Sequence, residues 1–103
     1  MTATRPSPDD LTIEREEDAR EGRYVVRLDG QEAEMTYRRA GDRIIIIDHT
    51  GVPDALKGRG IGEALVRRGV EDARSEGRSI IPVCPFAKAL IERHVEWQDV
   101  LKR

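Results

Sequence analysis

The sequence predicts an α/β (α+β) domain: a mixed, mostly antiparallel five-stranded sheet with two main helices, in the order βββ-β-α-β-α. Two observations lead to this class. Apolar residues alternate along parts of the N-terminal half, as in strands that bury one face. Four consecutive isoleucines, Ile44 to Ile47, then precede a glycine-rich turn and an amphipathic helix, and another short apolar segment and helix follow.

The N-terminal half is expected to form a meander of antiparallel strands. Residues 11–13 begin a short first strand, and residues 23–28 form a second, which ends at the turn pair Asp29-Gly30. Residues 32–39 alternate in polarity, which predicts a third strand with one apolar face: Ala33, Met35 and Tyr37.

A fourth strand and a long helix follow. Residues 43–50 contain the isoleucine run, whose unbroken apolar character predicts burial on both faces. From Ile61 to Gly77, apolar residues recur at helical spacing. Gly69 is a poor helix former in mid-helix, so we expect it to contact the sheet closely. Gly77 is placed to end the helix.

The chain is expected to close with one more strand and helix. Residues 79–83 form the fifth strand, and a strand–helix–strand crossover predicts that it runs parallel to the isoleucine strand. Residues 85–95 form the second helix, with its inward positions at Ala87, Leu90 and Ile91.

Composition limits the classes of protein. The length of 103 residues predicts one domain, residues 11–103, after a short disordered tail, residues 1–10, that lacks the apolar core of a secretory signal. No apolar run approaches the ~20 residues needed to cross a bilayer, so no membrane association is expected. A net charge of −2 and few aromatic residues argue against nucleic-acid binding. The single cysteine excludes an internal disulfide and fits the cytoplasm.

The glycine-rich turn before the long helix predicts an anion site. Gly58, Gly60 and Gly62 expose backbone N–H groups next to the positive end of the helix dipole, an arrangement suited to phosphate. The turn is not a P-loop, since the Gly-Lys-Ser/Thr ending is absent. A dinucleotide fingerprint fits poorly, because no βαβ unit follows. A purely structural turn is the simpler alternative.

The same residues resemble a known family. Lys57-x-x-Gly60-x-Gly62 is similar to the Arg/Gln-x-x-Gly-x-Gly/Ala signature of the GNAT-type N-acetyltransferases. The resemblance covers roughly residues 11–101 and implies a GNAT-like fold. Two flanking motifs are similar to a small, single-domain branch of predicted acetyltransferases: His49-Thr50-x-Val52-Pro53 and Pro82-x-Cys84-Pro85-Phe86.

The resemblance implies transfer of acetyl from acetyl-coenzyme A (acetyl-CoA) to a primary amine, either a small amine or a protein lysine, without a metal. It also implies that the parallel strands diverge to admit the pantetheine arm. The sequence leaves open whether the protein forms a homodimer. The residues implied in cofactor binding are Val52, Lys57, Gly58, Arg59, Gly60, Ile61 and Gly62.

Cys84 is the leading candidate for chemistry. It precedes Pro85, a residue favoured at the first position of a helix, and a thiol beside a helix N-terminus is favoured as the thiolate. The implied geometry places the sulfur near the acetyl thioester, either as a nucleophile or as a contact to pantetheine. The alternative is a small buried apolar residue.

His49 and Asp48 end the isoleucine strand and are candidates for the general base. Neighbours on a regular strand point to opposite faces, so at most one faces the substrate unless a bulge intervenes. His49 is the better candidate, since imidazole titrates near neutral pH. A structural histidine at this position is the alternative.

The residue that protonates the leaving thiolate is missing. Larger family members carry a tyrosine where this chain has Ile91, and His94, one turn further along, is the less favoured substitute. This gap supports a rival hypothesis, a non-catalytic acyl-CoA-binding sensor or interaction module. A nucleotide-binding fragment is a third, weaker hypothesis.

Overall fold

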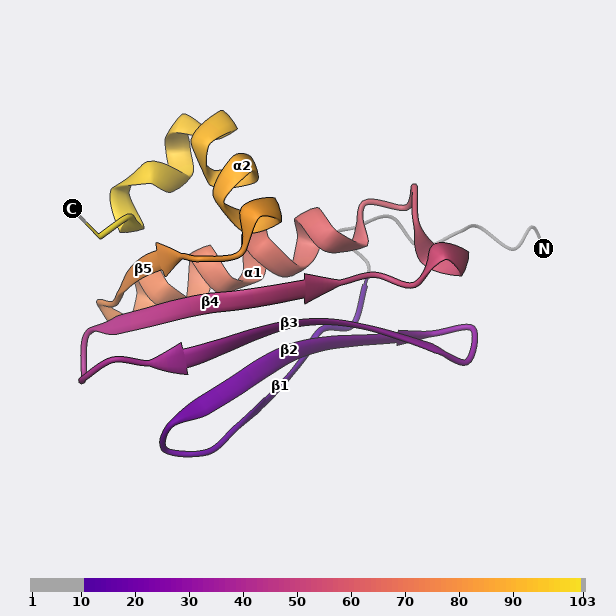
Figure 1. Cartoon of the computed structure of the whole chain (residues 1–103), viewed down its shortest axis with the longest axis horizontal. Coiled ribbons are helices and arrows are strands. Elements are labelled where there is room, and N and C mark those ends of the chain that lie inside the picture. The colour runs from indigo at the N-terminus through magenta and orange to yellow at the C-terminus, as the bar shows by residue number, and fades with distance from the viewer. Residues whose placement is uncertain (1–10, 103) are drawn as a thin grey trace.

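The computed structural model describes residues 11–102 (Figure 1). The expected tail, residues 1–10, lies outside this range. None of the helices within it is long and apolar enough to cross a membrane. The strands and helices are β1 (Glu14–Glu17), β2 (Glu21–Leu28), β3 (Gln31–Arg39), β4 (Ile44–Gly51), α1 (Ile61–Glu76), β5 (Ser79–Pro82) and α2 (Pro85–Arg93), with short 3-10 helices at Asp54–Leu56 and Val95–Val100.

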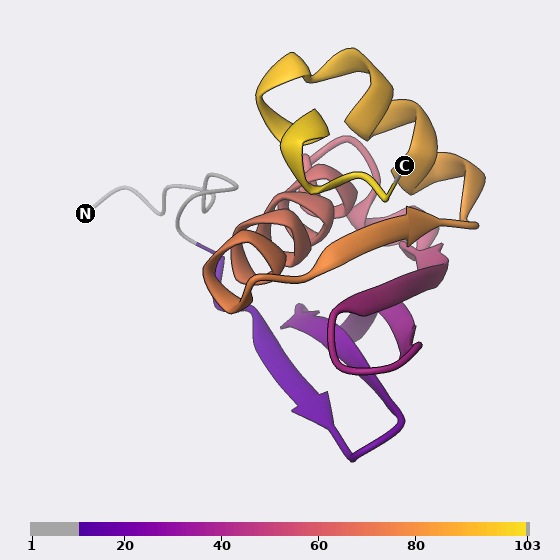
Figure 2. The same ribbon diagram turned by 90° about the vertical axis from the view of Figure 1, so that its left-hand side faces the viewer.

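The five strands form one sheet in chain order, β1-β2-β3-β4-β5. β1 to β4 pair with one another in antiparallel fashion, and β5 pairs with β4 in parallel, as the crossover rule predicts. Helix α1 lies against one face of the sheet, and α2 lies at its β5 end (Figure 2). The chain then returns along β5, where the Lys102 N–H donates to the Ile80 carbonyl at 2.9 Å.

The core lies between the sheet and α1. The predicted apolar face of β3 is confirmed, because Ala33, Met35 and Tyr37 are buried. Their partners from the sheet and from α1 are Tyr24, Val26, Ile45, Ile47, Leu65, Val66 and Val70. Gly69 sits where α1 passes closest to this layer: a Cβ on it would lie 2.7 Å from Cε of Met35. The close approach predicted for this glycine is therefore confirmed.

Gly69→Val should lower the free energy of unfolding by about 2 kcal/mol, because overpacking a filled core typically costs 1–3 kcal/mol. Urea unfolding measures the effect. In a Met35→Ala background the obstructing methyl is gone, and we expect a distinctly smaller cost. An equal cost in both backgrounds would contradict the proposed contact.

Two predicted strands need correction. Pairing with β2 begins at Glu14 rather than at Leu11, because Leu11 and Ile13 pack against the core instead. In β4, Ile45 and Ile47 are buried but Ile44 and Ile46 are only partly covered, so burial on both faces was wrong. One face of the isoleucine run packs on the core, and its other face is only partly covered by the rest of the chain.

The second helix also ends earlier than expected, at Arg93. The next residue, His94, adopts an extended conformation, and its Nδ1 lies 2.8 Å from the Leu90 carbonyl at the end of the helix. Its ring stacks on Trp97 at a centroid separation of 3.9 Å. These contacts stop the α-helix and start the short 3-10 helix that follows.

Arg15 ties β1 to α1. Its guanidinium donates to the Tyr37 hydroxyl at 2.9 Å and to the Glu76 carboxylate at 2.5 Å, and it lies 3.3 Å from the Glu17 carboxylate. The hydrogen bond from Arg15 holds the pKa of Glu76 below its ordinary 4.5. The pKa of Glu17 is lowered chiefly by a hydrogen bond from Tyr37. The first strand is thus held to α1 by ion pairs, in addition to its sheet pairing with β2.

This cluster predicts a loss of stability in acid. Because the pKa of Glu76 is lower in the folded protein than in the unfolded chain, its stabilisation is present above pH 4.5 and disappears as the pH falls through the folded value. Glu76→Gln should therefore be less stable than the parent near neutral pH, and the difference should shrink on acidification. Denaturant unfolding between about pH 6 and about pH 3 measures this. A difference that stays constant over this range would contradict the assignment.

Candidate cofactor and active site

The parallel strands part at their carboxyl ends. The last residues in register are Ile47 and Pro82, and the Val83 and Cys84 N–H groups both donate to the Ile47 carbonyl at 3.0 Å. Beyond this point β4 continues to Gly51, paired only with β3. The separation implied by the family resemblance is therefore present. It opens beside the first turns of α1 and α2.

A β-bulge in β4 falls at the two candidate bases. Tyr37 pairs with Ile47 and Thr36 pairs with His49, so Asp48 is the extra residue. His49 is exposed, and its Nε2 lies only 2.9 Å from where a Cβ on Gly51 would sit. The bulge thus leaves His49 beside the open end of β4.

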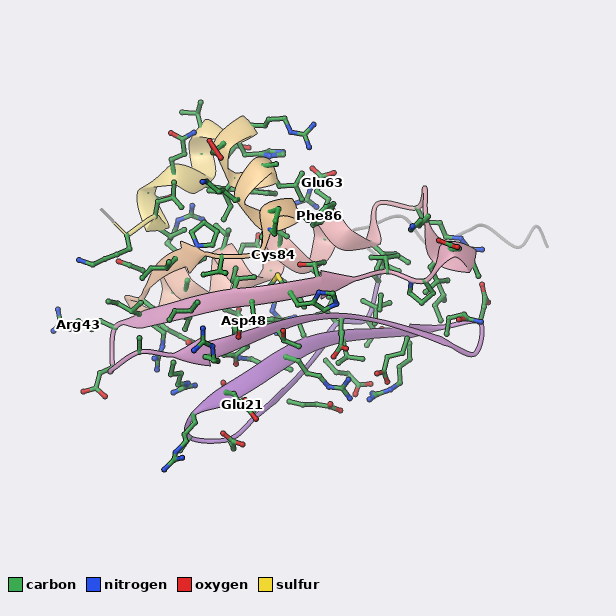
Figure 3. The ribbon with its side chains drawn as sticks, viewed as in Figure 1. Glu21, Arg43, Asp48, Glu63, Cys84 and Phe86 are labelled. Atoms are coloured by element: carbon green, nitrogen blue, oxygen red, sulfur yellow. The ribbon has the colours of Figure 1, made fainter. Side chains whose placement is uncertain are left out.

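Asp48 is directed elsewhere. Its two carboxylate oxygens each accept from Nε of Arg38 at 3.0 Å. It also borders a separate hollow, whose other acidic side chains are Glu16, Glu17, Asp18 and Glu21. Figure 3 labels Asp48 and Glu21. The structure therefore does not bring Asp48 together with the glycine-rich turn.

A cavity of about 590 Å³ lies where the strands separate. The end of β4, the glycine-rich turn and the first turns of both helices form its walls. Six of the seven residues predicted to bind the cofactor line it. The full lining is Thr50, Gly51, Val52, Leu56, Lys57, Gly58, Gly60, Ile61, Gly62, Glu63, Phe86 and Leu90.

The glycine-rich turn has the backbone geometry of an anion cradle. Gly58 and Gly60 have φ values of 83° and 74°, a left-handed conformation that favours glycine. Gly60 is the N-cap of α1, and no side chain caps this helix. The first backbone bond runs from the Ala64 N–H to the Gly60 carbonyl at 3.0 Å, so the N–H groups of Ile61, Gly62 and Glu63 have no partner within the helix.

The two cations of the turn are each paired with a carboxylate. Lys57 Nζ lies 2.9 Å from Asp54, three residues earlier. Arg59 lies 2.9 Å from Asp29 in the turn between β2 and β3, so the one predicted residue that is not part of the lining points toward another loop. These pairs are exposed and weak, so a bound polyanion would compete for both cations.

Cys84 is the N-cap of α2, and Pro85 occupies the first turn, as predicted. The side chain is 4% exposed. Its sulfur, drawn in yellow in Figure 3, lies 3.5 Å from the Thr50 hydroxyl. Thr50 lines the cavity. The thiol therefore contacts the end of β4, next to a residue of the cavity lining.

His94 belongs to a different contact. Its Nε2 lies 3.2 Å from a carboxylate oxygen of Glu63 in the first turn of α1. Because its Nδ1 also faces a carbonyl, the ring links the end of α2 to the start of α1. His94 reaches the cavity only through Glu63, which lines it.

Six residues of the lining were not among the predicted site residues: Thr50, Gly51, Leu56, Glu63, Phe86 and Leu90. They come from four separate elements, and only the folded chain brings them together. One signal was available: Phe86 follows the Cys84-Pro85 pair at the start of a helix, next to the residue already considered for chemistry.

Comparisons with known proteins agree on the family. The model of the GCN5-related N-acetyltransferase family matches residues 23–100. The human Protein NATD1 is 39% identical over 81 residues, which cover 77% of this chain and 72% of that protein. The chicken (Gallus gallus) Protein NATD1 is 38% identical over 84 residues, with coverages of 80% and 76%.

A solved structure gives the same result for the fold. It is the NMR solution structure of a GCN5-like protein from Staphylococcus aureus, which is 37% identical to this chain and superposes with a TM-score of 0.69. The match covers 89% of this chain and 88% of that one. The predicted GNAT-like fold is therefore confirmed, and the chain is a small member of the GCN5-related N-acetyltransferase family.

Proposed function

We propose that this protein binds acetyl-CoA in the cavity between β4 and β5 and transfers the acetyl group to a primary amine. One observation carries the proposal: the residues at the uncapped N-terminus of α1 line a cavity at the point where the pairing of the parallel strands ends. Amides at a helix N-terminus bind phosphate, and the diphosphate of CoA meets that requirement. Residues 11–103 then act as one acetyltransferase domain, and the cytoplasm suits its single free thiol.

The proposed site has two ends. Gly58, Gly60 and Gly62 supply backbone donors for the diphosphate, and Lys57 and Arg59 exchange their carboxylate partners for phosphate oxygens. Val52 and Ile61 contribute apolar wall. At the other end, the carbonyl of the thioester lies between the separated strands, within reach of residues at their carboxyl ends.

Cys84 is proposed as the nucleophile. Its thiolate attacks the acetyl carbonyl, a bond from sulfur to carbon forms, and the bond to the CoA sulfur breaks, so that CoA leaves as its thiolate. The neutral amine then attacks the acetyl-cysteine and gives up its second proton to solvent, and the Cys84 thiolate is released. The positive end of the α2 dipole stabilises this thiolate at both stages.

His49 is proposed as the base that receives the proton of the acceptor ammonium. It is exposed at the β4 bulge beside Gly51, which lines the cavity. Asp48 and His94 are less suited to chemistry, since Arg38 holds the first and Glu63 and Leu90 hold the second.

A non-catalytic acyl-CoA sensor is the second candidate, and one observation favours it: Cys84 is buried and is not part of the cavity lining. Incubation with acetyl-CoA and a panel of polyamines and lysine peptides separates the two functions. The enzyme releases free CoA thiol in proportion to acetylated amine. A sensor binds CoA and releases none.

A further inference from the structure

Phe86 is a large apolar side chain that the fold leaves half-exposed, at 44%. It lies in the first turn of α2 and lines the cavity together with Leu90, one turn later on the same helix. The exposed side of an aromatic ring on a cavity wall is a surface available to a ligand. The other large exposed apolar side chains of the described residues, Val83 and Val95, do not line the cavity.

The ring of Phe86 reaches across to α1 and rests over Gly62. A Cβ on Gly62 would lie 2.7 Å from Cζ and 2.9 Å from Cε1 of this ring, and 3.6 Å from Cγ2 of Val52. Contacts below 3.0 Å require something to shift. The absence of a side chain at residue 62 therefore lets the two helices meet through the ring.

Gly62 thus differs from the other glycines of the turn. Gly58 and Gly60 have positive φ values that favour glycine, whereas Gly62 lies within α1 and its φ is not positive. Helix geometry accepts any residue at this position in the first turn, so the backbone does not require a glycine there. The ring of Phe86, and not the backbone conformation, is the reason for a glycine at this position.

We propose that Phe86 and Gly62 form a steric pair that sets the width of the cavity for the pantetheine arm of CoA, which makes Phe86 a specificity-determining residue for this arm. The inference rests on the proposed function. The pantetheine arm is uncharged and carries methyl and methylene groups around its two amides, and the walls beside the ring offer apolar surface to those groups: Val52, Ile61 and Leu90. The charged end of the cofactor meets backbone amides instead, so the ring distinguishes the arm from the nucleotide.

Calorimetry with two ligands tests the ring directly. CoA carries the arm, whereas 3′-phosphoadenosine 5′-diphosphate carries the same nucleotide and diphosphate without it. Phe86→Ala should bind CoA about tenfold more weakly than the parent, the effect of losing one aromatic contact, and should bind the nucleotide equally well. Val95→Ala, which removes an exposed apolar side chain away from the cavity, should change neither affinity.

A double variant tests the pairing. Gly62→Ala should displace the ring into the cavity and weaken CoA binding, and Phe86→Ala in the same chain should cancel this added loss. If Gly62→Ala weakens CoA binding equally with and without the ring, the glycine serves phosphate approach and the pairing is wrong. Circular dichroism of each variant verifies that it is folded.

The nucleotide separates the two hypotheses. If the parent protein binds both ligands and Phe86→Ala changes neither affinity, the inference about Phe86 fails and the proposed function stands. If the parent binds neither ligand, the proposed function fails as well.

Discussion

Gly60→Val is expected to reduce CoA affinity by at least about a hundredfold, since it displaces the amides that we propose to bind the diphosphate. Gly60 is the N-cap of α1 in the left-handed region, with φ 74° and ψ 15°. A β-branched side chain is strongly disfavoured there, at a cost of about 1–2 kcal/mol or more. The turn must rearrange to relieve this strain, and its backbone N–H groups then no longer point at one position.

Gly60→Asn is the matched control. Asparagine tolerates the left-handed conformation and is a favoured N-cap residue, so this variant should retain CoA affinity within about threefold. Thermal unfolding of both variants verifies that the sheet and α1 persist. If the valine and asparagine variants bound CoA equally well, the conformation of the turn would have no part in binding.

Cys84→Ala is expected to lower turnover by at least about a hundredfold while leaving CoA affinity within about twofold, because it removes the proposed nucleophile and leaves the glycine-rich turn intact. The parent protein, mixed with acetyl-CoA and no amine, should gain the mass of one acetyl group, and the variant should not. Peptide mapping should locate this group on Cys84. Free-thiol release with an active amine gives the rate.

Two controls keep this prediction sharp. Cys84 is a small buried side chain, so its truncation should cost about 1 kcal/mol of stability, which thermal unfolding detects. Thr50→Ser keeps the hydroxyl that lies 3.5 Å from the sulfur and should stay active. An unchanged rate in Cys84→Ala, with no acetyl-enzyme in the parent, would mean that the thiol only packs in the core.

Local chemistry made much of the fold predictable. The alternation in β3 identified its buried face, and Asp29-Gly30 marked a turn in which both residues have positive φ. Gly77 marked the end of α1, where φ is 69°. Each of these features depends on residues within one element and its immediate neighbours, so the sequence pattern contains the information.

The rest of the site depends on contacts between distant segments. The bonds between Cys84 and Thr50 and between Arg59 and Asp29 join residues about 30 positions apart, and no local pattern signals them. The same holds for the ring of Phe86 over Gly62. Burial of β4 was overestimated for a related reason: an isoleucine run does not show how far another element covers the second face.

The most direct test of the account is an NMR titration of the ¹⁵N-labelled chain with CoA. We predict that the largest amide shifts fall on Gly58, Gly60 and Gly62, with further shifts at Val52 and Phe86, and that they saturate at one equivalent. Shifts centred on another surface, or none at ligand excess, would contradict a diphosphate site at this turn.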